Sequence, residues 1–106
     1  MGLLAATVTK QYLIAYKNDI EYKKSLILQS KMNLSQASGD LLHAGTDLDP
    51  ENPVIKQLEE RKARLNLLEK KLDMELNEYD EKLQMIDGNI KNCDKIIESS
   101  ISSMNK

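Results

Sequence analysis

The sequence predicts an all-α fold: an antiparallel two-helix hairpin, similar to a coiled coil, with a proline-containing turn. Apolar residues recur at helical spacing through both halves of the 106-residue chain, and both prolines lie near its middle. The chain has no Phe or Trp, and 30% of its residues are charged, which is typical of long helices with a solvated exterior. We therefore expect one helical-hairpin domain over residues 1–106.

The second half carries the stronger helical pattern. Its apolar residues follow one another at spacings of three or four, with polar and charged residues between them. Gly88 alone interrupts the pattern, and one glycine inside a helix costs about 1 kcal/mol relative to alanine. The pattern predicts a helix from about residue 53 to about residue 102. The apolar row consists of Leu65, Leu68, Leu72, Leu76, Tyr79, Leu83, Ile86, Ile90, Cys93, Ile97, Ile101 and Met104.

The first half has a regular row of apolar residues seven apart, which predicts a helix over about residues 4–42. Tyr16 and Ala37 supply part of a second row, which polar residues interrupt in the middle. A glycine in the left-handed conformation often ends a helix, so we expect the end between Gly39 and Gly45. The row seven apart consists of Leu13, Ile20, Ile27, Leu34 and Leu41.

The segment 43–52 is expected to form the turn, with Pro50, Asn52 and Pro53 as its defining residues. Proline suits the first position of a helix because its missing N–H would have no partner there. Either Asp49-Pro50 or Asn52-Pro53 can open the second helix, with the Asp or Asn as N-cap. Each apolar row must be buried against another surface, and in an antiparallel hairpin the two rows bury each other within one chain. The alternative is a single bent rod whose halves pair with other molecules.

Charge and composition disfavour several classes of partner. The net charge is only -2, which gives no general attraction to nucleic acid. No stretch reaches the ~18 apolar residues of a membrane span. The N-terminal residues lack the pattern of a cleaved signal peptide. We expect cytoplasmic synthesis without such a signal, with export to the cell surface by a signal-independent route as the alternative.

The residue types that carry catalysis or bind metals are sparse, so we expect no enzyme, no cofactor and no metal site. His43 falls in the predicted turn, and Cys93, the one cysteine, occupies an apolar position where it acts as a small hydrophobic residue. The alternating Asp47, Asp49 and Glu51 resemble the start of a calcium loop. The glycine and the closing glutamate of that motif are missing.

A lone hairpin leaves apolar residues outside the seam, the strip where the two helices meet, and small chains with thin cores need partners. We expect self-association into an oligomer. Ile96 and Ile97 are adjacent and point to different sides of the helix, so at least one of them is free to face a neighbour. We expect the subunit contact to be Ile96, Ile97, Ile101 and Met104. The flanking apolar residues are Leu26, Leu28, Leu42, Leu67, Met74, Met85 and Ile96.

The stretch Pro50-Glu51-Asn52-Pro53-Val54-Ile55 resembles the turn of type III secretion needle subunits, in which two prolines flank two small polar or acidic residues and an apolar helix start follows. The C-terminal "CDKIIESSISSMNK" is similar to the apolar ending of that family. The resemblance implies a hairpin subunit without enzymatic residues that assembles helically around a channel.

Two functions follow as hypotheses. The first is a structural subunit that self-assembles into a helical filament or tube, with a role in secretion. A subunit with two separate apolar faces can make contacts that do not close, and these give filaments. The alternative is a coiled-coil interaction module, a chaperone or regulator that binds a partner helix, which the near-continuous heptads favour.

Overall fold

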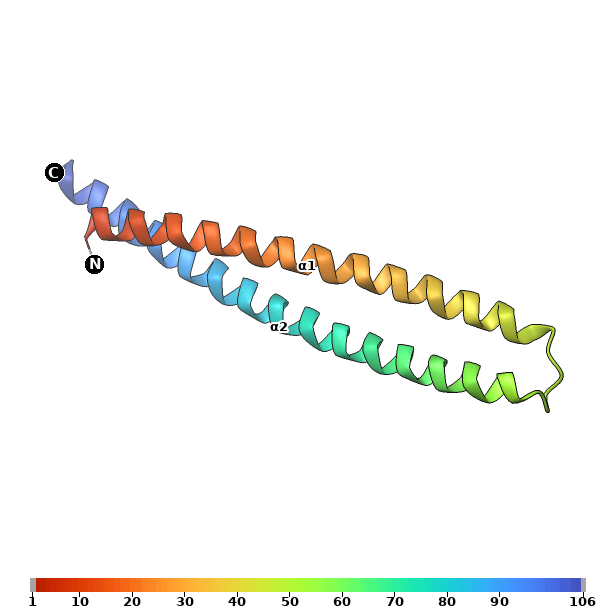
Figure 1. Cartoon of the computed structure of the whole chain (residues 1–106). Coiled ribbons are helices and arrows are strands. Elements are labelled where there is room, and N and C mark those ends of the chain that lie inside the picture. The colour runs from red at the N-terminus through yellow and green to blue at the C-terminus, as the bar shows by residue number, and fades with distance from the viewer. Residues whose placement is uncertain (1, 106) are drawn as a thin grey trace. The chain divides into compact units, whose positions relative to one another are not determined.

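The computed structural model describes residues 2–105 and contains two helices. Helix α1 spans Leu3–Thr46 and helix α2 spans Pro53–Met104, with no strand among the described residues. The helices run antiparallel on either side of the turn at 47–52 (Figure 1), so the predicted all-α hairpin is confirmed. Helix α1 continues past the expected end at about residue 42, and α2 begins at the expected residue, Pro53.

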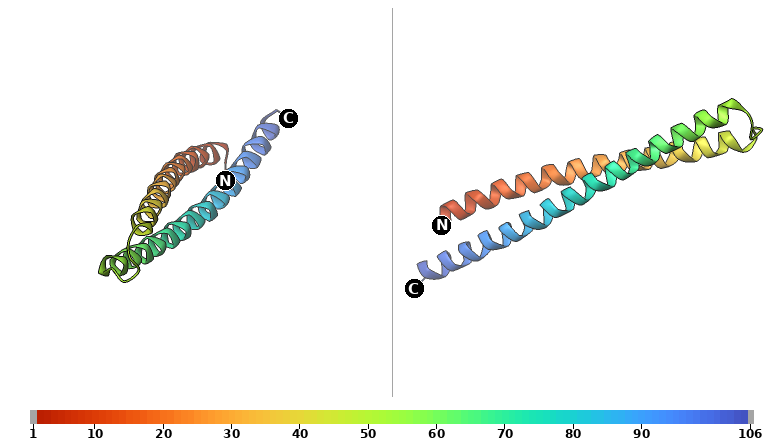
Figure 2. Two further views of the ribbon diagram at one scale, coloured as in Figure 1. Left: turned by 90° about the vertical axis from the view of Figure 1, so that its right-hand side faces the viewer. Right: turned by 90° about the horizontal axis from the view of Figure 1, so that it is seen from below.

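Contacts divide the chain into two compact units, each built from part of both helices. The terminal unit combines Met1–Lys24 with Glu78–Lys106, and the turn unit is Ser25–Asn77. Within the turn unit, the parts of α1 and α2 that flank the turn lie side by side in both views of Figure 2. Each unit therefore has its own stretch of seam.

The seam of the terminal unit contains four of the five buried apolar residues of the described chain. Ala6 and Ile20 come from α1, and Ile86 and Cys93 come from α2. The predicted row of α2 continues here with side chains that are half-buried: Tyr79, Leu83, Ile90 and Ile97. The heptad pattern thus identifies the buried face of α2 in this unit.

The turn unit is less tightly packed. Ile27 is its only buried residue among those described. Leu68, which belongs to the predicted row, is exposed and lies outside the seam. The half-buried apolar residues here are Leu34, Leu41, Leu48, Ile55, Leu58, Leu65, Leu72 and Leu76.

The expectation for the second row of α1 is wrong. Tyr16 and Ala37 are exposed, and the half-buried positions lie one residue further along the helix. A row seven apart is compatible with a second row either three or four residues later, and the sequence analysis chose the more apolar option. The actual second row is Leu3, Lys10, Lys17, Lys24, Lys31, Ser38 and Gly45.

The turn is fixed by two side-chain caps. Asp49 Oδ1 accepts a hydrogen bond from the Glu51 N–H at 3.1 Å, and the Asn52 N–H donates to the Asp49 carbonyl at 2.9 Å across Pro50. Asn52 Oδ1 then accepts the Val54 N–H at 3.0 Å, which makes Asn52 the N-cap of α2 and Pro53 its first residue. Asp49-Pro50 therefore forms the turn, and Asn52-Pro53 opens the helix.

The expected glycine cap of α1 is wrong. Gly39 and Gly45 are both helical, and no described residue has a positive φ. Helix α1 instead ends at Thr46, whose Oγ1 donates to the His43 carbonyl at 2.7 Å. This bond satisfies one of the carbonyls left without a partner in the last turn, so no left-handed residue is needed.

Candidate interaction surfaces

Four interhelical ion pairs follow the seam at a regular spacing. Every pair joins a lysine of α1 to an aspartate of α2, and each step of seven residues along α1 is matched by a step of seven backwards along α2. The terminal unit contains Lys10–Asp94 at 2.6 Å, Lys17–Asp87 at 2.8 Å and Lys24–Asp80 at 2.6 Å, and the turn unit contains Lys31–Asp73. We call these four pairs the Lys–Asp ladder.

The lysines of the ladder lie at seam positions, whereas the aspartates lie at the edge of the seam. The lysine side chains are 30–34% exposed, and the aspartate side chains are 43–49% exposed. A lysine can occupy such a position because its aliphatic stem packs against apolar neighbours while its ammonium group reaches outward. The aspartate then meets the ammonium group where it emerges.

Two pairs of the ladder favour the charged form of their lysines, Lys17 and Lys31. The hydrogen bond to Asp87 and the charge of Asp87 raise the pKa of Lys17 above 10.5, with a smaller contribution from Glu21. The hydrogen bond to Asp73 likewise raises the pKa of Lys31, and the charges of Asp73 and Glu69 add to it. Burial of the two lysines opposes both shifts.

The ladder specifies one register of the two helices. A shift of α2 by one heptad would preserve the spacing but leave one lysine at one end and one aspartate at the other end without a partner, and a shift by any number of residues that is not a multiple of seven would separate all four pairs. Polar residues at core positions of coiled coils are known to fix register in this way, at a cost in stability. The sequence analysis missed the ladder, although its signal was present: the lysines and aspartates repeat with the same period of seven as the apolar residues.

All five lysines of α1 form ion pairs. Lys23, the one outside the ladder, pairs with Asp19 at 3.0 Å on the same helix. The hydrogen bond and charge of Asp19 raise the pKa of Lys23. Among residues 3–18 the only charged side chains are Lys10 and Lys17, both at the seam. The outward face of this part of α1 therefore carries no charge.

That outward face carries an apolar ridge instead. Leu4, Val8, Tyr12 and Tyr16 follow one another at intervals of four, and their exposed fractions are 78, 58, 69 and 39%. The rings of Tyr12 and Tyr16 are stacked, with centroids 6.5 Å apart and an angle of 5° between the planes. We call these four residues the α1 ridge. Exposed apolar groups that adjoin one another are typical of interaction sites.

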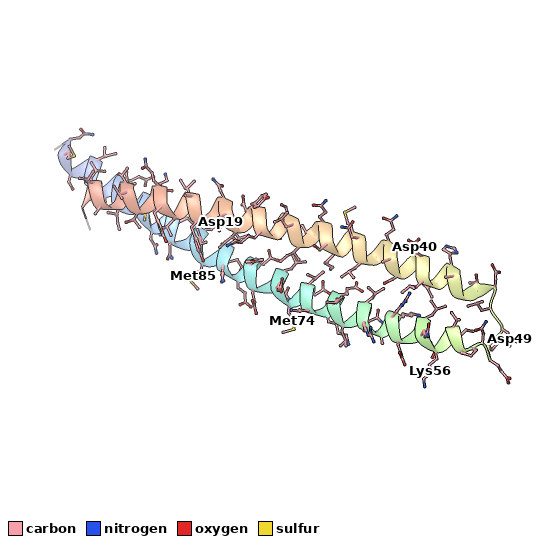
Figure 3. All side chains as sticks on the ribbon, in the orientation of Figure 1. Asp19, Asp40, Asp49, Lys56, Met74 and Met85 are labelled. Carbon is pink, nitrogen blue, oxygen red and sulfur yellow. The ribbon has the colours of Figure 1, made fainter. Side chains whose placement is uncertain are left out.

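The outward face of α2 in the terminal unit is different. Met85 is 67% exposed and, as Figure 3 shows, points away from α1, but charged residues surround it in the sequence. Glu81 and Lys82 precede it, and Asp87 follows. Lys82 lies over the ring of Tyr79, with its Nζ 5.8 Å from the ring centroid. This face is charged and solvated, and its exposed methionine is isolated.

The turn unit has two apolar hollows beside its seam. One of about 280 Å³ lies between Leu41, Leu42, Ile55 and Leu58, and one of about 540 Å³ is lined by residues that include Leu65, Leu68 and Arg64. A small residue of α1 borders each hollow: Ala37 the larger and Gly45 the smaller. A Cβ on Gly45 would stand 3.7 Å from Leu58 Cδ1.

The residues expected to make the subunit contact lie near the end of α2. Ile96 and Ile97 are both half-buried, whereas Ile101 and Met104 are exposed. The register of the Lys–Asp ladder places Leu3 level with Ile101. Met104 lies one turn further along α2, past the first residue of α1. The exposed part of this run is therefore Ile101 and Met104, and whether it contacts a neighbour stays a prediction.

The residues considered for chemistry are placed as follows. His43 is exposed in the last turn of α1, Cys93 is 4% exposed within the seam, and Asp49 uses one carboxylate oxygen to cap the turn. Between residues 2 and 105, no three His, Cys, Asp or Glu side chains gather closely enough to hold a metal ion. In the same range, neither helix combines the length and apolar character needed to cross a bilayer.

Comparison of the chain with protein-family models, with curated proteins and with solved structures finds no match.

Proposed function

We propose that this chain is a structural subunit that works by assembling with copies of itself through apolar surfaces on its helices. One observation carries the proposal: the hairpin leaves many of its large apolar side chains exposed, outside its own seam. Five apolar residues are buried in the described chain, whereas seventeen large apolar residues are exposed. Burying such side chains against a partner is favourable by about 25 cal/mol per Å².

The accessible surface supports the same proposal. The chain exposes 8133 Å². A compact monomeric protein of 12.1 kDa exposes about 6,000 Å². The excess of about 2,100 Å² is larger than the ~800 Å² that each partner contributes to a standard interface. The hairpin therefore has enough surface for more than one contact.

A helical filament or tube is the form of assembly that we propose. Its support is that the apolar surfaces are several and lie on different parts of the chain: the α1 ridge, the end of α2 and the hollows of the turn unit. Contacts between different surfaces produce open, helical assemblies wherever the rotation between subunits does not close into a ring. The hairpin plan and the proline turn also accord with the resemblance to secretion needle subunits.

The alternative function is the binding of a helix from another protein. The hollows of the turn unit favour it, because an apolar groove beside two helices can accept the apolar side chains of a third. In that case the chain would act as a chaperone or regulator rather than as a filament subunit.

Sedimentation velocity of the purified chain over a wide concentration range, with negative-stain microscopy of the same samples, tests the proposal. We expect the mean mass to rise with concentration and fibres of constant width to form at the upper end. A discrete dimer or tetramer at all concentrations would favour the alternative over the filament. A chain that stays monomeric throughout contradicts self-assembly.

A further inference from the structure

We propose that the α1 ridge packs against the same ridge of a second copy, with the two α1 helices antiparallel, so that two hairpins form a symmetric pair. This inference rests on the proposed self-assembly and names the surface that carries it. The ridge consists of Leu4, Val8, Tyr12 and Tyr16 in the terminal unit.

The spacing of the ridge suits helix–helix packing. Residues four apart form a continuous ridge along a helix, and such ridges fit into the grooves between the corresponding ridges of a second helix. Tyr12 and Tyr16 already stack on each other. Tyrosine is enriched at interfaces, since its large, rigid ring buries much surface while its hydroxyl stays at the wet edge. The ridge thus resembles one half of a helix–helix contact.

The absence of charge on the ridge favours a second copy as the partner. In a symmetric contact each surface meets itself, so any charge on it meets a like charge. Residues 3–18 present no charged side chain apart from Lys10 and Lys17, which Asp94 and Asp87 bind at the seam. The α1 ridge can therefore meet its own copy without repulsion.

The other helix of the terminal unit could not make this contact equally well. Between residues 78 and 104, α2 has six acidic residues and three lysines. Two copies that met through α2 would bring like charges together. The acidic residues are Glu78, Asp80, Glu81, Asp87, Asp94 and Glu98, and the lysines are Lys82, Lys91 and Lys95. Pairing through α1 leaves α2 of both copies facing solvent.

The distribution of charge along α1 also argues for burial of the ridge. In a hairpin that works alone, charges belong on the outward face and apolar residues belong at the seam. Here the lysines are at the seam, and leucine, valine and tyrosine are outside. A second copy packed on the outward face would bury those side chains, which the hairpin alone leaves exposed.

Sedimentation equilibrium of the full chain tests the inference with three single substitutions. Tyr12→Glu places a charge on the ridge at an exposed site, and Tyr12→Lys places the opposite charge there. Met85→Glu is the matched control, because it adds the same charge at a similarly exposed site on α2 of the same unit. We expect each Tyr12 variant to weaken self-association at least tenfold, and Met85→Glu to leave it unchanged. An equimolar mixture of the two Tyr12 variants should recover association, because an antiparallel pair centred between Val8 and Tyr12 brings the two altered side chains near each other, where their opposite charges attract.

The outcomes separate this inference from the proposed function. If the wild type associates and Tyr12→Glu associates equally well, or if Met85→Glu weakens association as much, the ridge is not the contact, while self-assembly stands. If the wild type stays monomeric at every concentration, both the inference and the proposed function are overturned. Should Tyr12→Glu lose helix content by circular dichroism, Leu4→Glu at the most exposed residue of the ridge replaces it, with the same expectations.

Discussion

Lys17 Nζ lies 2.8 Å from Asp87 Oδ1, in the middle of the three interhelical ion pairs of the terminal unit. The pair joins residues 70 positions apart in the sequence. The neighbouring Lys–Asp pairs lie seven residues away along each helix. The apolar rows show which faces of the two helices meet. The Lys–Asp ladder shows which residue of one helix stands opposite which residue of the other.

Charge reversal across one ladder pair should be destabilising, and reversal of both partners should rescue it. Asp87→Lys places a second ammonium group beside Lys17, so we expect a lower melting temperature in dilute buffer. Lys17→Glu combined with Asp87→Lys restores an attractive pair and should recover most of the loss. The difference between the single and double variants should shrink in about 1 M salt, where the Debye length is only ~3 Å. Equal melting temperatures of the two variants in dilute buffer would show that the pair does not couple the helices.

Alkaline pH should weaken the Lys–Asp ladder. The pKa values of Lys17 and Lys31 are raised above 10.5 in the folded chain, so folding favours their protonated form. The stabilisation is complete below about pH 10.5 and is lost as the pH rises through the folded pKa values. We expect the melting temperature to fall over that range.

A Lys17→Arg, Lys31→Arg variant supplies the control for this pH dependence, because arginine stays charged above pH 12. All other residues are the same in the wild type and in this variant, so the difference between their melting temperatures isolates the two lysines. That difference should widen above about pH 10.5. A constant difference would mean that deprotonation of these two lysines does not affect stability.

Gly88 is a site where stability can be gained. It lies inside α2 with a negative φ, and a Cβ built there meets no atom within 4 Å. Gly88→Ala should therefore raise the free energy of unfolding by about 0.4–1 kcal/mol, since alanine loses less backbone freedom on folding. Urea denaturation of the two proteins measures the gain. Gly39→Ala, also inside a helix and also without a close neighbour, should behave similarly.

The core of the terminal unit should be sensitive to the shortening of a buried side chain. Ile20 is 2% exposed, so Ile20→Ala removes buried methylene groups and leaves a cavity at the seam. We expect a cost of about 2–5 kcal/mol in the free energy of unfolding. Met85→Ala, at an exposed position of the same unit, is the comparison and should cost far less. Similar losses in the two variants would mean that Ile20 is not packed as the structure shows.

The hairpin and its break could be predicted from sequence because period and turn chemistry are local signals. The apolar row of α2 and the Asn52-Pro53 start depend on neighbours within a few residues. The second row of α1 could not be chosen correctly on hydrophobicity alone, since lysines hold those positions. Only the matching aspartates on the other helix make Lys10 and Lys17 suitable there. The prediction of a glycine cap was wrong although its signal was local. Gly45 suits the end of a helix, but the Thr46 side chain caps α1 without any residue in the left-handed conformation.

The same contrast applies to the candidate contact surfaces. Ile101 and Met104 were expected at an interface because they are apolar and terminal, and both are exposed. The α1 ridge was overlooked because Leu4, Val8 and Tyr12 look like ordinary helix residues until the seam is known. Once Lys10 and Lys17 are assigned to the seam, the ridge lies on the outward face. A face is thus identified as unpartnered only when the partnered face has been located.

The last prediction concerns the step from a pair of hairpins to a filament. A symmetric contact through the α1 ridge closes with two copies, so an open assembly needs a second contact at a different surface. Ile101 and Met104 are the exposed apolar residues of α2 near its C-terminal end. We expect the Ile101→Glu, Met104→Glu variant to form no fibres in negative stain while it still forms pairs in sedimentation. Ser102→Glu with Ser103→Glu is the matched control, because it adds the same charge to exposed positions of the same helical turn and should leave fibres intact. If the isoleucine and methionine variant still forms fibres of the same width, the second contact lies elsewhere, and the apolar hollow beside Leu41 and Ile55 becomes the next surface to alter.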